Sequence, residues 1–167
     1  MTQQDQITET KVWQLMGEIN DPEVPVLSVI DLGIVRDVIV NGELVEVVIT
    51  PTYSGCPAMD VITMDIKMIL IENGFTKIKV STVLSPAWTT EWMTTNGKNK
   101  LKAFGIAPPS AKQQLCHSEL FHEREVVQCP HCDSYNTILV SRFGSTPCKA
   151  LYVCETCKEP FDLFKCH

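Results

Sequence analysis

Several features that mark large classes of protein are missing from this sequence of 167 residues. No apolar run approaches the roughly 20 residues that a helix needs to cross a bilayer, so we expect no membrane contact. Residues 1–11 are polar and lack the basic and then apolar pattern of a secretory signal, which predicts a cytoplasmic protein. Basic side chains are outnumbered, with 14 Lys and Arg against 20 Asp and Glu, for a net charge of −6. That balance argues against a partner with a phosphate backbone, DNA or RNA.

The sequence also lacks the motifs of oxygen and redox enzymes. It has no pair of Glu-x-x-His motifs for a di-iron site and no G-x-G-x-x-G for a dinucleotide. A cysteine-hydrolase triad has no support, because no His, Asn or Asp can be assigned beside a candidate thiol. These absences favour an accessory role, handing over or scaffolding, and we expect no catalytic activity.

Cysteine, in contrast, is abundant and unevenly distributed. Cys56 stands alone in the first hundred residues, and the other seven cysteines fall between Cys116 and Cys166. Gly105, Pro108 and Pro109 interrupt regular structure between the two regions. The sequence therefore predicts a domain over residues 1–104, a linker over 105–124 and a second module over 125–167.

The N-terminal region predicts the order α-β-β-α-β-α, a small α+β sandwich with helices against one sheet. Apolar residues at helical spacing predict a first helix that ends at Asn20-Asp21-Pro22; they are Val12, Leu15, Met16 and Ile19. Asn41-Gly42 between two β-branched runs predicts a hairpin. Further elements are expected as a helix over residues 57–73, a strand around Ile78 and Val80, and a helix over 88–104 that weakens at Asn96-Gly97.

The second module carries two C-x-x-C knuckles 21 residues apart, formed by Cys129, Cys132, Cys154 and Cys157. Two such turns at the tips of hairpins can direct four sulfur atoms at one ion, the pattern of a zinc ribbon. Strands are expected over residues 137–140, 150–153 and 160–164. Disulfides, free thiols or iron in place of structural zinc are the alternatives. The other thiols and imidazoles in this half are expected to be bystanders or packing residues and to form no second site: Cys116, His117, His122, His131, Cys148, Cys166 and His167.

Cys56 follows a loop rich in hydroxyl groups, residues 50–54, and precedes Pro57 at the expected start of a helix. Free backbone N–H groups and the helix dipole favour a thiolate at such a position. The arrangement suits a reactive or metal-accepting thiol. A small buried residue that happens to precede a helix is the equally weighted alternative.

Acidic residues precede the first expected strand, at Asp21, Glu23 and Asp31. Their carboxylates could bind metal or accept N–H bonds from the Cys56 loop, and solvated turn residues are the alternative. The apolar stretch Ser85–Trp88, with Trp92 and Met93, favours core packing over a partner surface.

Three motifs in this order resemble the DUF59 (MIP18-like) family of iron–sulfur assembly factors: Asp21-Pro22-Glu23, Asp31-Leu32-Gly33 and the Thr50 to Pro57 loop with Cys56. With the stretches 85–93 and 105–109 and the four-cysteine ribbon, the whole chain resembles the D-protein family of bacterial phenylacetate degradation.

The resemblance implies a maturation factor that helps insert iron or an iron–sulfur cluster into the phenylacetyl-CoA oxygenase or its reductase. It transfers the iron-handling role to Cys56, with Asp31 and more weakly Glu23, and the zinc-ligand role to the four ribbon cysteines. A structural or effector component of the oxygenase complex is the alternative function. A homodimer through an exposed Trp-containing region is left open.

Overall fold

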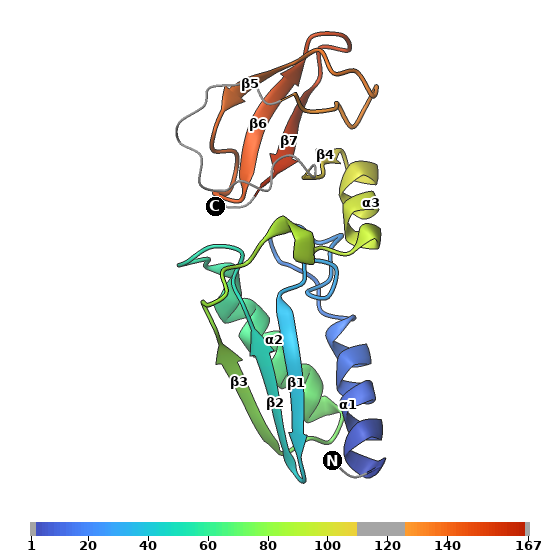
Figure 1. Cartoon of the computed structure of the whole chain (residues 1–167), viewed down its shortest axis with the longest axis vertical. Helices are drawn as coiled ribbons and strands as arrows, with labels where there is room; N and C mark the ends of the chain where they lie inside the picture. Colours follow the sequence, from blue (N-terminus) through green and yellow to red (C-terminus); the bar gives the residue numbers. More distant parts are fainter. Residues whose placement is uncertain (1–2, 110–125, 166–167) are drawn as a thin grey trace.

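A three-stranded sheet organises the N-terminal part of the protein (Figure 1). In this computed structural model, which describes residues 3–109 and 126–165, the strands are β1 (Val35–Asn41), β2 (Leu44–Ile49) and β3 (Lys77–Thr82). The central strand β2 pairs antiparallel with β1 and parallel with β3. The parallel pair requires a crossover, which the helix between β2 and β3 supplies.

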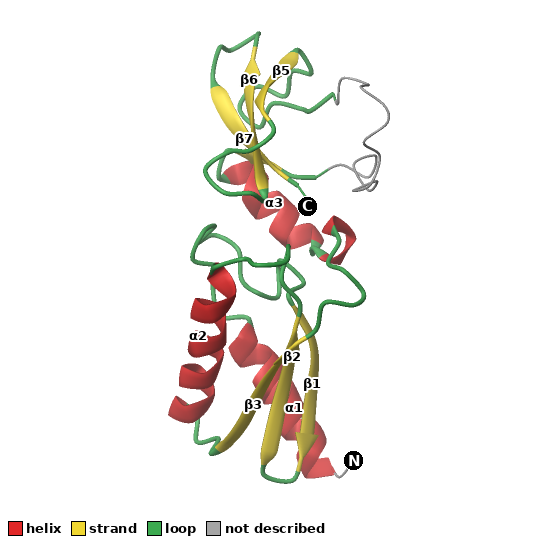
Figure 2. Cartoon of the chain, turned by 90° about the vertical axis from the view of Figure 1, so that its left-hand side faces the viewer, coloured by secondary structure: helices red, strands yellow, loops and turns green. Residues whose placement is uncertain are grey.

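Two helices, α1 (Gln3–Met16) and α2 (Ala58–Glu72), cover one face of this sheet (Figures 1 and 2). All four apolar residues predicted to mark the first helix face are buried. However, α1 ends at Met16, before the predicted stop at Asn20-Asp21-Pro22. The amides of Glu18 and Ile19 bond to carbonyls three residues back, so the chain turns tightly after Gly17.

The predicted hairpin is confirmed, with its turn shifted by one residue. Asn41 pairs with Leu44 as the last residue of β1, so Gly42 and Glu43 are the two turn residues. Gly42 has φ of +61°, a conformation that glycine adopts at low cost.

The last predicted helix of this part is divided at a different place. A 3₁₀ turn, η1 (Thr90–Trp92), precedes α3 (Thr95–Ala103), and the break falls at Met93-Thr94 instead of Asn96-Gly97. Gly97 lies within α3, where a Cβ would stand 2.8 Å from the carbonyl oxygen of Asp31. Gly97 therefore allows α3 to pack closely against Asp31. From sequence alone, a glycine needed for close packing cannot be told from one that ends a helix.

The C-terminal part is a four-stranded sheet of order β4-β7-β6-β5. Its strands are β4 (Ile106–Ala107), β5 (Thr137–Ser141), β6 (Lys149–Cys154) and β7 (Pro160–Phe164), and the three expected ones are confirmed. The short strand β4 lies where a linker was expected and pairs parallel with β7. The exact domain boundaries stay a prediction.

The two parts are packed end to end and share a core (Figure 2). Cys148 and Phe164 of the second part belong to the same buried cluster as Trp88 and the N-terminal core. Trp88 also donates its indole N–H to the carbonyl of Leu32 at 2.9 Å. The core-packing interpretation is thus confirmed for Trp88 and Met93, whereas Trp92 is half-buried, and a homodimer stays a prediction.

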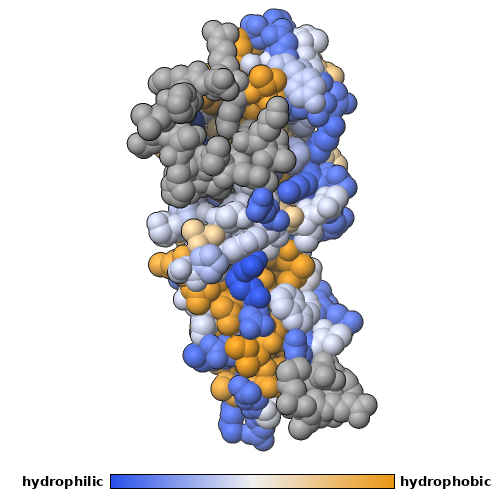
Figure 3. All heavy atoms as spheres, viewed as in Figure 1, coloured by the Kyte–Doolittle hydropathy of each residue, from blue (hydrophilic) through white to orange (hydrophobic). Residues whose placement is uncertain are grey.

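The other face of the first sheet is open to solvent, and Figure 3 shows apolar side chains among polar ones on this side. Ile39 and Leu44 are each at least 36% exposed there. Within the ranges 3–109 and 126–165, no helix has the length and apolar character to cross a membrane.

Candidate functional site

The four ribbon cysteines converge on one point. Cys129 and Cys132 precede β5, whereas Cys154 ends β6 and Cys157 lies in the turn to β7. Their sulfur atoms all lie within 4.8 Å of one another, with Cys129 to Cys157 at 3.8 Å and Cys132 to Cys154 at 3.5 Å. A tetrahedral zinc ion with four Zn–S bonds of about 2.3 Å places its sulfur atoms about 3.8 Å apart. The donor set therefore fits zinc.

The two knuckles have matching backbone geometry. Asp133 and Lys158, each directly after the second cysteine of its knuckle, have φ of +57° and +66°. Each donates its N–H to the carbonyl of the first cysteine, Cys129 or Cys154, at 3.0 and 2.9 Å. Two turns of one shape thus present both sulfur pairs to the same ion.

Backbone amides favour negative charge at one of the four sulfur atoms, that of Cys154. The N–H of Cys157 lowers the pKa of Cys154, whereas burial raises it. Because the N–H of Thr156 also lowers it, the pKa of Cys154 is about 6. Against the N–H of Ser134, burial and hydrogen bonds to the other three sulfur atoms raise the pKa of Cys132 to about 12, so protons must leave the site when the metal binds.

Cys56 lies at the start of α2, half-buried against the N-terminal core. The Ala58 N–H and the Tyr53 hydroxyl both bond to its sulfur, as expected at a helix start. The helix start alone would favour a thiolate, but the surroundings of Cys56 oppose it. Burial, followed by the charges of Glu23 and Asp21, raises the pKa of Cys56 despite these two donors.

Glu23 lies beside a second thiol, for which the sequence predicted only a packing role. The Cys148 sulfur, directly before the ribbon strand β6, is 3.7 Å from Glu23 Oε2 and 3.0 Å from Thr146 Oγ1. Burial raises the pKa of Cys148 to about 11. Burial and the negative charges of Cys56, Glu23 and Cys148 also raise the pKa of Tyr53. Four groups linked by this contact and by charge interactions are called the junction cluster below: Glu23, Tyr53, Cys56 and Cys148.

The other two acidic residues have separate partners. Asp21 is buried, and its Oδ1 accepts the backbone N–H groups of Glu23 and Val24 at 2.7 and 2.8 Å. Burial raises the pKa of Asp21, against these bonds. Asp21 therefore fixes the loop that carries Glu23.

Asp31 joins its loop to α3. Its carboxylate accepts bonds from Lys100 at 2.6 Å, Thr94 at 2.9 Å and Asn96 at 3.1 Å. Burial alone would raise the pKa of Asp31, but the bonds from Lys100, Asn96 and Thr94 outweigh it and lower the pKa to about 2. None of these partners belongs to the Cys56 loop, so a role of Asp31 in iron handling stays a prediction.

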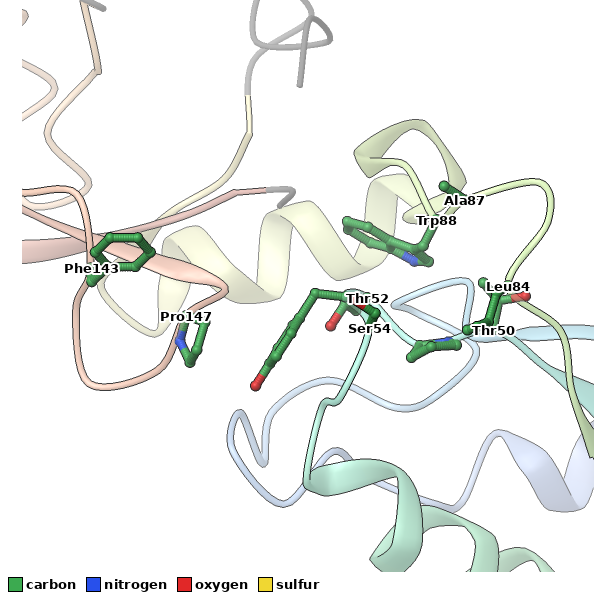
Figure 4. A pocket seen from close by; sticks show the side chains of 10 residues that line it. Thr50, Thr52, Ser54, Leu84, Ala87, Trp88, Phe143 and Pro147 are labelled. Carbon is green, nitrogen blue, oxygen red and sulfur yellow. The ribbon is translucent and has the colours of Figure 1, made fainter. Parts of the chain in front are cut away.

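A cavity of about 530 Å³ adjoins the junction cluster. Figure 4 shows Thr50, Thr52 and Ser54 of the loop before Cys56 on one side, with Phe143 and Pro147 of the ribbon across the gap. Leu84 and Trp88 complete its apolar wall. The Thr50 hydroxyl is buried and has no hydrogen-bond partner within the described part of the chain.

The place of Cys148 in this site was not predicted from the sequence. The available signal was that Cys148 stands outside both C-x-x-C spacings, in the short run Ser145-Thr146-Pro147-Cys148. His131, expected to be a turn residue, lies against Gly105 at the exposed edge of its knuckle. The remaining candidates lie outside the described residues: Cys116, His117, His122, Cys166 and His167.

Comparison with known proteins supports both parts of the architecture. Residues 9–81 match the family described as iron–sulfur cluster assembly protein, and residues 114–165 match the PaaD zinc beta ribbon domain. The chain is also similar to a crystal structure of a DUF59 domain from Bacillus anthracis, with a TM-score of 0.56 and 29% identity. That similarity covers 59% of this chain and 94% of the other.

Two named relatives match at the sequence level. An Fe-S protein maturation auxiliary factor from Porphyromonas gingivalis is 33% identical over 52% of this chain and 83% of its own length. An Escherichia coli protein, named as the D component of a "Putative 1,2-phenylacetyl-CoA epoxidase", is 49% identical over 93% of this chain and 92% of its own. The four converging cysteines are thus the zinc site of a PaaD-type ribbon. With both parts and nearly the full length matched, the chain belongs to the D-protein family of the phenylacetyl-CoA epoxidase.

Proposed function

We propose that this protein helps load iron or an iron–sulfur cluster into the phenylacetyl-CoA epoxidase system of phenylacetate degradation. It acts as an accessory protein without catalytic activity, and its client is the oxygenase or its reductase. Support comes from the Escherichia coli relative named after the epoxidase, the similar maturation factor from Porphyromonas gingivalis, and the match to the assembly family.

The observation that carries this proposal is the setting of Cys56. Its thiol is half-buried at the start of α2, interacts with Glu23, and follows the loop that lines the cavity. A thiol of raised pKa is protonated when idle, which protects it from oxidation, and it is deprotonated when a cation binds. Iron is therefore held transiently, with Cys56 as the thiolate and Glu23 as the nearby oxygen donor.

Asp31 supports this site from a distance in the proposal. It fastens α3 to the loop after Val29, and α3 leads directly into β4 of the ribbon sheet. The orientation of the ribbon, and with it the width of the cavity, depends on that connection.

The test uses cells from which the gene for this protein is deleted. The cells express the epoxidase system together with either the wild-type protein or one of its variants. With Cys56→Ser we expect an iron-poor, weakly active epoxidase system, whereas Glu43→Gln, at an exposed carboxylate on the β1–β2 turn, restores full loading. Zinc content of each variant reports whether the ribbon is intact. Full iron loading and activity with Cys56→Ser would contradict the proposal.

A lasting structural or effector role in the oxygenase complex is the second candidate, and α2 favours it. Apolar side chains repeat along the solvent side of that helix, each between 46% and 63% exposed: Val61, Met64, Met68 and Ile71. Exposed apolar stripes of this kind often bind a partner. If this role holds, purified mature oxygenase loses turnover when this chain is removed and regains it on re-addition. Unchanged turnover would reject it.

A further inference from the structure

The junction cluster brings together candidate ligands from two parts of the protein. Cys56 and Glu23 come from loops of the N-terminal part, whereas Cys148 lies directly before β6 of the ribbon. Cys148 is only 5% exposed, yet its sulfur lies against a carboxylate instead of purely apolar atoms. A buried cysteine that only fills space has no need of such a neighbour.

We propose that Cys148 is the second thiolate ligand for transferred iron(II), beside Cys56, with the Glu23 carboxylate as the third ligand. The ribbon then has two tasks, since its four other cysteines hold structural zinc while Cys148 completes the transfer site. This inference rests on the proposed function for the identity of the cargo, but the binding itself is measured separately.

The ligand set suits a site from which metal must leave. Thiolate and carboxylate donors both bind iron(II), and three protein ligands leave a coordination position open for a client group. The four-sulfur zinc site is closed by comparison. An open site at the edge of the cavity gives a client segment access to the metal.

A lysine side chain near the junction cluster offsets the net charge of the iron-loaded site. Two thiolates and one carboxylate around iron(II) leave one net negative charge. Lys149 is only 7% exposed, and its ammonium lies 3.5 Å from the Glu23 carbonyl and 3.4 Å from Ser145 Oγ. A buried cation at this distance offsets the residual charge of the loaded site.

Iron(II) binding releases protons and transfers no electrons. Each thiol loses its proton to solvent as its sulfur bonds to the metal, so two protons leave for each iron(II) bound and no electron is transferred. Among the described residues, the four zinc cysteines are the one ligand group that already lies within 4.8 Å. Iron binding therefore requires Glu23, Cys56 and Cys148 to move toward one another.

The test is an anaerobic titration of the zinc-loaded full chain with cobalt(II), a coloured probe for iron(II). We expect one cobalt per chain with a thiolate-to-cobalt absorption band that falls by about half in Cys148→Ser and in Cys56→Ser, because each removes one of two thiolates. Glu23→Gln weakens binding but keeps the band, and Glu43→Gln, at an exposed carboxylate on the β1–β2 turn, changes nothing. Retained zinc shows that each variant is folded.

X-ray absorption at cobalt in the wild-type chain avoids any dependence on a variant, since it counts sulfur neighbours directly. Two sulfur neighbours support the proposal and one overturns it. A band lost in Cys56→Ser but unchanged in Cys148→Ser overturns the role of Cys148 and leaves the proposed function standing. No cobalt binding by the wild type overturns the transfer site, and the cellular iron-loading assay then decides the proposed function independently.

Discussion

The ring of Trp88 meets the ring of Phe164 edge-on, with centroids 6.2 Å apart and planes inclined at 79°. Trp88 belongs to the N-terminal part and Phe164 ends the last strand of the ribbon, so one aromatic pair joins the two cores. Both side chains are buried. This packing holds the ribbon beside the loop before Cys56, so that Phe143 and Pro147 line one cavity with that loop.

Phe164→Ala should lower the free energy of unfolding by about 3–5 kcal/mol, because it removes a fully buried ring and leaves a cavity. Urea unfolding of the zinc-loaded chain measures this. Phe104→Ala is the matched control, since Phe104 is 56% exposed and its loss should cost about 0.5 kcal/mol or less. Equal effects of the two changes would show that the two parts do not share a core.

Removal of zinc should unfold the ribbon. Among the described residues its own core is small, with eight buried side chains of which two are zinc ligands, so metal binding supplies much of its stability. After chelation we expect loss of protected amides in β5, β6 and β7, while β1 to β3 stay protected, as followed by hydrogen exchange. Full protection of β6 in metal-free protein would contradict this.

The contribution of Asp31 should depend on pH. Its folded-state pKa of about 2 lies below the ordinary value of 3.8, so its stabilisation is present above pH 4 and is lost as the pH falls towards 2. Asp31→Asn should cost about 2 kcal/mol at pH 7 and much less at about pH 2.5. Unfolding is measured for variant and wild type at each pH. Glu43→Gln, which breaks an exposed ion pair with Lys77, should cost little at either pH.

Cys56 should be a slow nucleophile. Because burial and the charge of Glu23 raise its pKa, alkylation by iodoacetamide at about pH 8 should lag behind that of a free cysteine peptide. Glu23→Gln removes a negative charge, lowers the pKa of Cys56 and should accelerate the reaction several-fold. Mass spectrometry of the Cys56 peptide gives the rates. A wild-type rate at or above that of the free peptide would overturn the raised pKa.

Local sequence patterns determined much of this protein. The spacing of apolar residues predicted the order of helices and strands. A helix that buries one face needs apolar residues every three or four positions, and a strand needs them at every second position, whatever surrounds it. The paired C-x-x-C knuckles determined the zinc site, since two cysteines three residues apart in one turn face the same ion. The Pro57 that follows Cys56 likewise located the start of α2.

Only the tertiary structure decided the ionisation of Cys56 and the neighbours of Glu23. The helix start predicted a thiolate, but burial and two carboxylates brought by a distant loop oppose it. Gly97 was predicted to weaken the helix, but in the structure it lies within α3 and allows close packing against Asp31. Cys148 lies 125 residues from Glu23 along the chain, and their 3.7 Å contact exists because β7 and Trp88 dock the ribbon on the N-terminal part. No local pattern encodes such a meeting, since it depends on packing between surfaces that are far apart in sequence.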